Sequence, residues 1–221
     1  MQLFKFLVVI GLVTLSACVK PGDPDSRDVV DTEKQALRSP DVLKAAGLGA
    51  VSLGAKAKVD ELFVSEVNAD VFFRRVDSPN AKLEWLGTGS KGLGKFGFGP
   101  YVRALEPGAY ALFSFKYLAG RGENSGTPGA AFQRRGEPQP ADFVLRAGEV
   151  LNLGEVVIGT YLTETERQKR RRDRRRGFYI VSRASSQAVA ERFKNDYPTL
   201  APVLESRPIT CPACPPRPPE N

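Results

Sequence analysis

The stretch Ala109–Leu118, AYALFSFKYL, is the clearest strand signal in the chain, and the rest of the fold can be argued outward from it. Side chains of a strand point alternately to its two faces, so this pattern predicts one buried and one partly wet face. The predicted core-facing row is Ala111, Phe113, Phe115 and Tyr117. The predicted opposite row is Leu112, Ser114 and Lys116. The turn residues Glu106, Pro107 and Gly108 come immediately before this strand.

Further apolar runs of strand length flank this segment and are separated by turn residues. We expect a mainly β fold, a β-sandwich of about seven strands with one C-terminal helix. The strand signals begin near Lys58 and continue at 71–76, 82–86, 101–105, 142–146, 150–158 and 178–181. A helix is predicted over 185–196, with Ala188, Val189 and Phe193 facing inward and Tyr197-Pro198 ending it.

Between these runs, the sequence predicts less structure. Residues 41–58 are rich in Ala and Gly, and only a short helix over 42–46 is predicted there. Residues 119–140 contain many Gly and Pro residues and are predicted to form a long loop. The predicted sandwich domain therefore covers 58–206.

The segments LEPGAYAL (105–112) and FVLRAGEVLNLGEV (143–156) resemble small bacterial lipoprotein domains with a transthyretin-like or carboxypeptidase-regulatory-like sandwich. In those domains a Pro-Gly turn leads into a strand, and a strand pair joined by Ala-Gly-Glu follows. The resemblance covers roughly residues 59–158. It implies a sandwich fold and no assigned activity.

The first eighteen residues, MQLFKFLVVIGLVTLSAC, have the pattern of an export signal. Lys5 precedes an apolar run over 6–15 that is shorter than the roughly 20 residues of a membrane span. The ending Leu-Ser-Ala-Cys resembles the lipobox of bacterial lipoproteins. That resemblance implies cleavage after residue 17, acylation of Cys18 and membrane anchoring through it. Val19 in place of Asp favours the outer membrane, with the domain facing the periplasm. An ordinary secretory leader with a chance cysteine is the alternative.

After the predicted cleavage site, residues 18–57 are expected to form the acylated N-terminus, a disordered tether and a short helical segment. At the other end, residues 207–221 form a tail too rich in proline for regular structure. Cys211 and Cys214 lie in this tail. An exported pair of this kind predicts a disulfide, either between the two or to another chain, while a redox or metal role needs a context that the tail lacks.

A basic run, RQKRRRDRRR at 167–176, carries a charge of +7, which equals the net charge of the whole chain. Lys5 adds one more positive charge, which leaves the rest of the mature chain near −1. The candidate anion-binding residues are Arg167, Lys169, Arg170, Arg171, Arg172, Arg174, Arg175 and Arg176. The run would bind lipopolysaccharide, phospholipid or an acidic partner, or it is a solvated protrusion between strands. Without interleaved aromatic residues, no nucleic-acid binding is expected.

The chain contains no histidine, which lowers the expectation of a metal site or of general-base catalysis. The Gly-rich stretch 87–100 matches nucleotide-loop spacings, but Phe96-Gly97-Phe98-Gly99-Pro100 cannot begin the helix that such loops need. We therefore expect no cofactor, no metal and no catalytic residues. The sequence predicts a non-enzymatic binding or structural module of the cell envelope, which meets an envelope protein, a glycan or anionic lipid.

Overall fold

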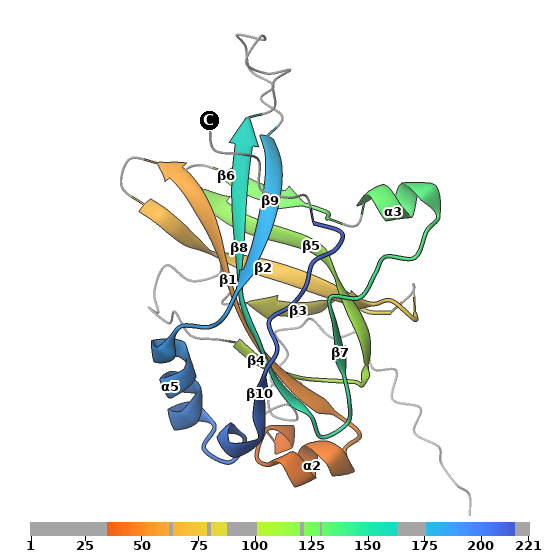
Figure 1. The fold of residues 1–221 in the computed structure, drawn as a ribbon, viewed down its shortest axis with the longest axis vertical. Helices are drawn as coiled ribbons and strands as arrows, with labels where there is room; N and C mark the ends of the chain where they lie inside the picture. Colours follow the sequence, from red (N-terminus) through yellow and green to blue (C-terminus); the bar gives the residue numbers. More distant parts are fainter. Residues whose placement is uncertain are drawn as a thin grey trace, which may run out of the picture.

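The chain folds around a ten-stranded β-sheet in the residues that the computed structural model describes, which are 35–61, 64–78, 81–87, 101–119, 122–128, 130–162 and 176–214. The prediction of a mainly β fold is confirmed (Figure 1). The strands are β1 Gly49–Glu61, β2 Val64–Arg75, β3 Glu84–Gly87, β4 Tyr101–Leu105, β5 Gly108–Ala119, β6 Gly122–Gly126, β7 Phe143–Leu145, β8 Val150–Leu162, β9 Arg176–Arg183 and β10 Leu204–Ser206. The helices are α2 Pro40–Ala45, α3 Ala130–Arg135, α5 Gln187–Asp196 and the 3-10 helix η1 Ala201–Val203.

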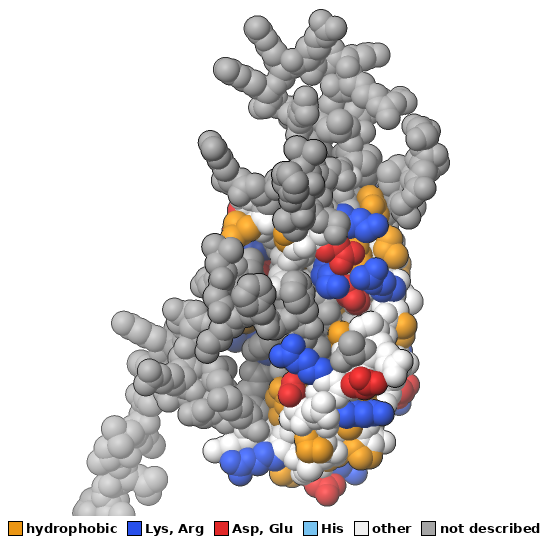
Figure 2. Space-filling model, turned by 90° about the vertical axis from the view of Figure 1, so that its left-hand side faces the viewer, with side chains coloured by type: hydrophobic (Ala, Val, Ile, Leu, Met, Phe, Trp, Pro, Cys, Tyr) orange, Lys and Arg blue, Asp and Glu red, His pale blue; other side chains and the backbone are white. Residues whose placement is uncertain are grey.

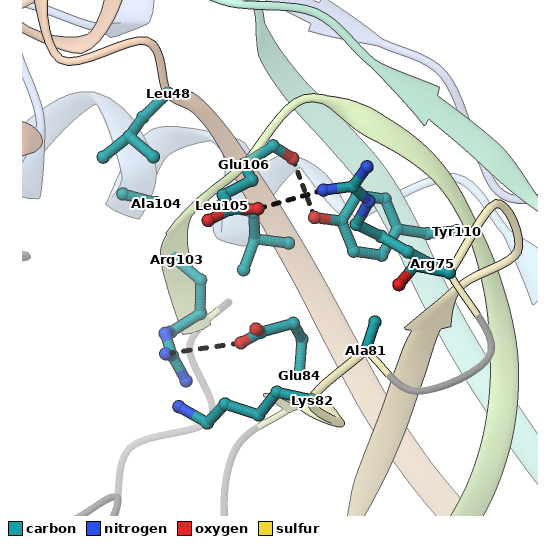
Figure 3. A pocket seen from close by; sticks show the side chains of 11 residues that line it. Leu48, Arg75, Ala81, Lys82, Glu84, Arg103, Ala104, Leu105, Glu106 and Tyr110 are labelled. Carbon is teal, nitrogen blue, oxygen red and sulfur yellow. Dashed lines mark hydrogen bonds and ion pairs between the residues drawn. The ribbon is translucent and has the colours of Figure 1, made fainter. Parts of the chain in front are cut away.

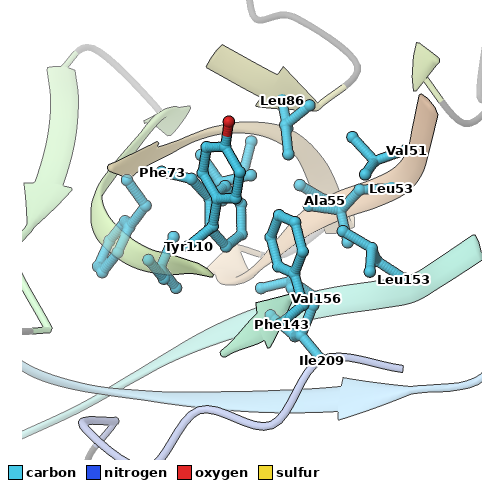
Figure 4. Packing of buried hydrophobic residues seen from close by; sticks show 14 of the residues in the cluster. Val51, Leu53, Ala55, Phe73, Leu86, Tyr110, Phe143, Leu153, Val156 and Ile209 are labelled. Atoms are coloured by element: carbon cyan, nitrogen blue, oxygen red, sulfur yellow. The ribbon is translucent and has the colours of Figure 1, made fainter. Parts of the chain in front are cut away.

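The sheet bends along β2, which divides it into two layers. Residues 64–68 of β2 pair with β1, whereas residues 69–75 pair with β5 and, on the other edge, with β3. The first layer contains β1, β4, β8, β9 and β10, and the second contains β2, β3, β5, β6 and β7. Buried side chains from both layers form one hydrophobic cluster, so the layers pack as an open sandwich (Figure 4).

Strand β1 is the centre of the first layer, and its residues from Ala50 to Leu53 are buried on both faces. It pairs with β4 and β2 along one edge and in parallel with β8 along the other. Val51 and Leu53 belong to the core between the layers, whereas Ala50 belongs to a second cluster beneath the helices. The sheet thus begins at Gly49, nine residues before the predicted start at Lys58. A strand covered on both faces shows no alternation, which explains the difference.

Two bulges change which side chains face the core. In β5, Phe72 pairs with Ser114 and Phe73 with Leu112, so Phe113 is an extra residue. The core row is therefore Tyr110, Leu112, Phe115 and Tyr117. The predicted row was right for Phe115 and Tyr117 and wrong for Ala111 and Phe113, and Leu112 was predicted on the opposite face, because the bulge shifts the period by one.

The second bulge lies in β8, where Asn152 and Glu155 pair with Ser52 and Gly54 of β1. Gly154 has a φ of 81°, and its N–H donates to Asn152 Oδ1 at 3.0 Å. A Cβ at this position would collide with the carbonyl oxygen of Arg183. Glycine is therefore favoured at position 154 for two reasons: the backbone is left-handed there, and β9 approaches too closely for a side chain.

A helical layer covers the outer face of the first layer. Leu43 of α2, Phe193 of α5 and Leu200 before η1 are buried against Ala50 and Val150. The predicted C-terminal helix is present from Gln187, two residues inside the predicted boundary. The short helix predicted over 42–46 is present as α2, Pro40–Ala45, with Ser39 accepting from the Val42 N–H at its start.

The segment predicted as a long loop over 119–140 contains two elements, and this prediction was wrong. Strand β6 pairs with residues 115–119 of β5, and α3 follows it. Gly126 is required where β6 passes the Phe115 ring, because a Cβ there would lie 2.5 Å from it. Pairing with β5 rather than strand propensity holds this glycine-containing segment in the sheet.

The start of the predicted tail packs on the domain. Between Arg207 and Cys214 the chain has no regular structure, yet Ile209 is buried in the main core. The N–H groups of Arg207 and Ile209 donate to Asn152 and Leu153 of β8, and that of Thr210 donates to the Asp142 carbonyl beside β7. Residues 207–210 therefore bridge the open edge between the two layers.

The long strands place helix α2 at one end of the domain and the ends at which β8 and β9 are joined at the other. The described chain begins beside α2, which leads into β1, and β8 starts next to it with Val150 opposite Ala50. Twelve residues later β8 ends at Leu162, opposite Arg176 of β9, about 40 Å away at the rise of a strand. Figure 1 shows α2 and α5 at one end and the joined ends of β8 and β9 at the other.

Candidate functional site

A pocket of about 480 Å³ opens between the two layers near α2 (Figure 3). Leu48, Ala104 and Leu105 form an apolar side, and charged groups from β2, β3 and β4 form the rest. Apolar walls with a few convergent polar groups are typical of ligand sites. The polar and charged lining residues are Arg75, Ser78, Lys82, Glu84, Arg103, Glu106 and Tyr110.

Arg75, the last residue of β2, is fixed by two carboxylates. Its Nη1 lies 2.9 Å from Glu106 Oε2, and its Nε and Nη2 lie 3.0 and 2.7 Å from the two oxygens of Asp77. The hydrogen bonds that Arg75 donates to Asp77 raise the pKa of Arg75, and the same contacts lower the pKa of Asp77. The guanidinium therefore ties the β2 end to the β4–β5 turn and forms one edge of the pocket.

Arg103 of β4 forms the opposite edge and is 9% exposed. Its Nη1 donates to the Trp85 carbonyl at 3.1 Å, and its Nη2 lies 3.9 Å from Glu84 Oε2. These contacts join β4 to β3 across the mouth of the pocket. Because a buried charge with fixed partners does not reorganise, Arg103 presents a preorganised positive wall.

Tyr110 and Lys82 complete the polar lining. The Tyr110 hydroxyl donates to the Glu106 carbonyl at 2.7 Å, and burial raises the pKa of this phenol, so it stays neutral. Lys82 is exposed, and within the described part of the chain no acceptor is recorded for its ammonium group. The pocket thus offers donors and acceptors of both signs beside an apolar surface.

A buried carboxyl group, Asp142, lies at the opposite edge of β5 from β2. Its Oδ2 accepts from the Leu112 N–H, and Gln139 Nε2 donates to the Leu112 carbonyl at 2.9 Å. These two side chains thus satisfy the backbone groups of Leu112 at the edge of β5, beyond the point where β7 stops pairing with β5. The other oxygen, Oδ1, is buried without a partner. Burial raises the pKa of Asp142 to about 7.

Asp142→Asn is expected to flatten the dependence of stability on pH. Between pH 4 and 7 the folded wild type holds a proton that the unfolded chain has released, so its unfolding free energy falls as pH rises. The total fall in unfolding free energy that Asp142 causes over this pH range is at most about 4 kcal/mol. Urea unfolding at pH 4.5, 6 and 8 measures it, with Glu123→Gln on the exposed face of β6 as the control. If the unfolding free energy of the variant falls with pH as steeply as that of the wild type, Asp142 is not the group responsible.

A second charge cluster ties the first layer together on its outer face. Glu155 of β8 lies 3.1 Å from Lys56 Nζ and 2.8 Å from Arg183 Nη2, and Glu66 lies within 4 Å of both cations. The hydrogen bond to Glu155 raises the pKa of Arg183. Figure 2 shows acidic and basic side chains interspersed over the described part of the face in that view. The cluster is a balanced network of four charges and stabilises strand pairing.

The residues predicted as functional sites lie largely outside the described ranges. Cys18, the basic residues 167–175 and the Gly-rich residues 88–100 all fall there. Arg176 begins β9 and pairs with Leu162, so the basic run joins adjacent strand ends. The structure records a disulfide between Cys211 and Cys214, and both residues pack against the main core.

The pocket was missed by sequence reasoning because its lining comes from positions 48 to 110 on separate elements. The single usable signal is the Glu-Pro-Gly turn at 106–108, which places Glu106 and Tyr110 together. In comparisons with known proteins, no family model, curated protein or solved structure matches the chain. Among the described residues, no helix has the length and apolar character needed to cross a membrane.

Proposed function

We propose that this protein is a lipid-anchored, non-enzymatic binding module of the cell envelope, held by acylated Cys18 at the periplasmic side of the outer membrane. The sequence of the leader supports the anchor. The pocket between the layers supports the binding role, and it is the observation on which the proposal rests. Its charged edges are fixed by Arg75–Glu106 and Arg103–Glu84 contacts before any ligand arrives.

Preorganised polar groups beside an apolar wall favour recognition of a polar ligand with both charged and apolar parts. An exposed segment of an envelope protein or a charged glycan has this character. The pocket lies at the α2 end of the domain, the end from which the predicted tether leaves. With the α2 end toward the anchoring membrane, the pocket would lie on the side of the domain that faces that membrane.

Site-specific photo-crosslinking tests this proposal. A photoreactive residue in place of Ala81, which lines the pocket, is expected to give a discrete adduct with one envelope component. The matched control replaces Ala184, an exposed alanine between β9 and α5. Ala81→Trp should fill the pocket and compete away capture of that component, whereas Ala184→Trp should not. Equal labelling from both positions would refute a pocket-directed partner.

A second function, anion recognition by the basic run 167–176, is favoured by the topology. The run joins the paired ends of β8 and β9, at the far end of the domain from α2. Eight cations within ten residues bind clustered phosphates, as on lipopolysaccharide or anionic phospholipid. This role is compatible with the pocket, because the two features lie at opposite ends.

A further inference from the structure

A second, smaller cleft of about 160 Å³ lies on the outer face of the second layer, at a distinct set of residues from the pocket except for Arg75. Its central residue is Arg74 of β2, opposite Ala111 of β5. The Arg74 guanidinium carbon lies 3.8 Å from the centroid of the Phe113 ring. This stacking uses the flat face of the guanidinium and leaves its edge, which carries the N–H donors, available.

The β5 bulge creates this arrangement. Because Phe113 is the extra residue between Leu112 and Ser114, it leaves the core row and lies on the outer face beside Arg74. Gln139 forms another wall, and its amide is fixed by the hydrogen bond to the Leu112 carbonyl. The cleft is therefore built from restrained side chains on the sheet.

No hydrogen-bond or ion-pair partner is recorded for Arg74. Of its nitrogens, only Nε is both shut off from solvent and unpartnered, so the two terminal nitrogens remain accessible. The nearby carboxylates already have cations: Asp77 and Glu106 bind Arg75, and Glu137 binds Arg135 at 2.7 Å. One positive charge in the cleft is thus unmatched, and its fork of donors has no acceptor among the described residues.

We propose that this cleft binds a carboxylate group, with Arg74 as the bidentate donor. A carboxylate matches the guanidinium fork in plane and spacing. Glu137 on the facing wall, together with the single unmatched cation, favours a monoanion over a phosphate, which carries more negative charge. Val76, Ala111 and Pro138 give the cleft apolar walls for a short stem behind the carboxylate. The carboxylate belongs either to a free small molecule or to an acidic side chain of a polypeptide.

Titration of the mature chain with butyrate, a monoanion with a short apolar stem, and with a blocked peptide carrying one Asp tests the site at constant ionic strength. The Nε–H of Arg74 is protected from solvent and serves as the ¹H–¹⁵N NMR reporter. We expect a saturable shift with at least one compound, and at least about tenfold weaker binding by Arg74→Gln. Arg134→Gln, an exposed arginine of α3, is the matched control and should bind as the wild type does.

The arms of the titration separate the sources of the carboxylate. Tighter binding of the peptide than of butyrate assigns the site to a polypeptide partner, and the peptide with Asn in place of Asp should then not bind. Equal binding of the two assigns it to free carboxylates. Absence of a saturable shift with both, or phosphate binding as tightly as either, overturns the proposal. If Arg74→Gln does not fold, Arg74→Lys keeps the charge but removes the fork, and wild-type affinity in that variant also overturns it.

Discussion

Cys18→Ser is expected to abolish membrane anchoring and to leave the leader uncleaved. In the lipoprotein class that the leader resembles, the cysteine thiol must be acylated before the chain is cut. Each buried acyl CH₂ contributes about 0.8 kcal/mol, and two or more chains hold a soluble domain stably on a bilayer. The variant loses this contribution entirely, and its apolar run over 6–15 is too short to span the membrane.

Fractionation of cells and labelling with a radioactive fatty acid measure this effect. The wild type should carry label and sediment with membranes, whereas the variant should be unlabelled, longer by the leader and largely soluble. A double variant, Cys211→Ser with Cys214→Ser, is the matched control and should remain labelled and bound. Label that persists in the Cys18 variant would show that acylation occurs elsewhere.

Replacement of the seven arginines and Lys169 in the run 167–176 with serine is expected to eliminate binding to anionic lipid. A basic residue near an anionic surface contributes about 1 kcal/mol, so the loss of eight lowers affinity by several orders of magnitude. Since the run joins the ends of two paired strands, the melting temperature should change little.

Co-sedimentation with vesicles that contain anionic phospholipid measures the affinity of the chain from Val19 onward. The same chain should not bind vesicles of neutral lipid, and rising salt should weaken binding because it screens the charges. Arg134→Ser combined with Lys194→Ser removes two exposed cations elsewhere and should have little effect. Undiminished binding by the eightfold variant would exclude the run as an anion site.

The sequence predicted well those elements that have one buried and one wet face. Strand β7 and the C-terminal helix were found from periodicity and turn chemistry alone, near their observed bounds. The helix shows why: Phe193 is buried while its neighbours Arg192 and Lys194 are exposed, so the helical period is visible in the residues themselves.

Elements shaped by their neighbours could not be predicted in the same way. The start of β1 needs a small residue because Gly49 passes close to the Arg146 carbonyl. This contact joins segments about a hundred residues apart. The bulges at Phe113 and Gly154 follow from pairing with β2 and β1, which no local pattern encodes. Ile209 is a single apolar residue in a proline-rich segment, and its burial depends on the open edge that it fills.

The candidate sites depend even more on such long-range pairing. Arg74 and Arg75 are neighbours in the sequence with the same side chain, yet Arg75 binds two carboxylates and Arg74 stacks on Phe113. The strand directs them to opposite faces, and only the fold determines what each face contains.

The separation between α2 and the far ends of β8 and β9 limits the orientations in which an anchored domain can use both of its ends. Seventeen residues, 18–34, precede the described chain, and fully extended they span about 60 Å. When the tether is extended and β8 points away from the anchoring bilayer, the two lengths add up. The basic run then lies up to about 100 Å from that bilayer. The run can also reach that same bilayer, because the tether of about 60 Å is longer than β8 and lets the domain turn over. With the proposed anchor at Cys18, an upright domain would instead present the end at which β8 and β9 are joined to whatever surface faces that membrane.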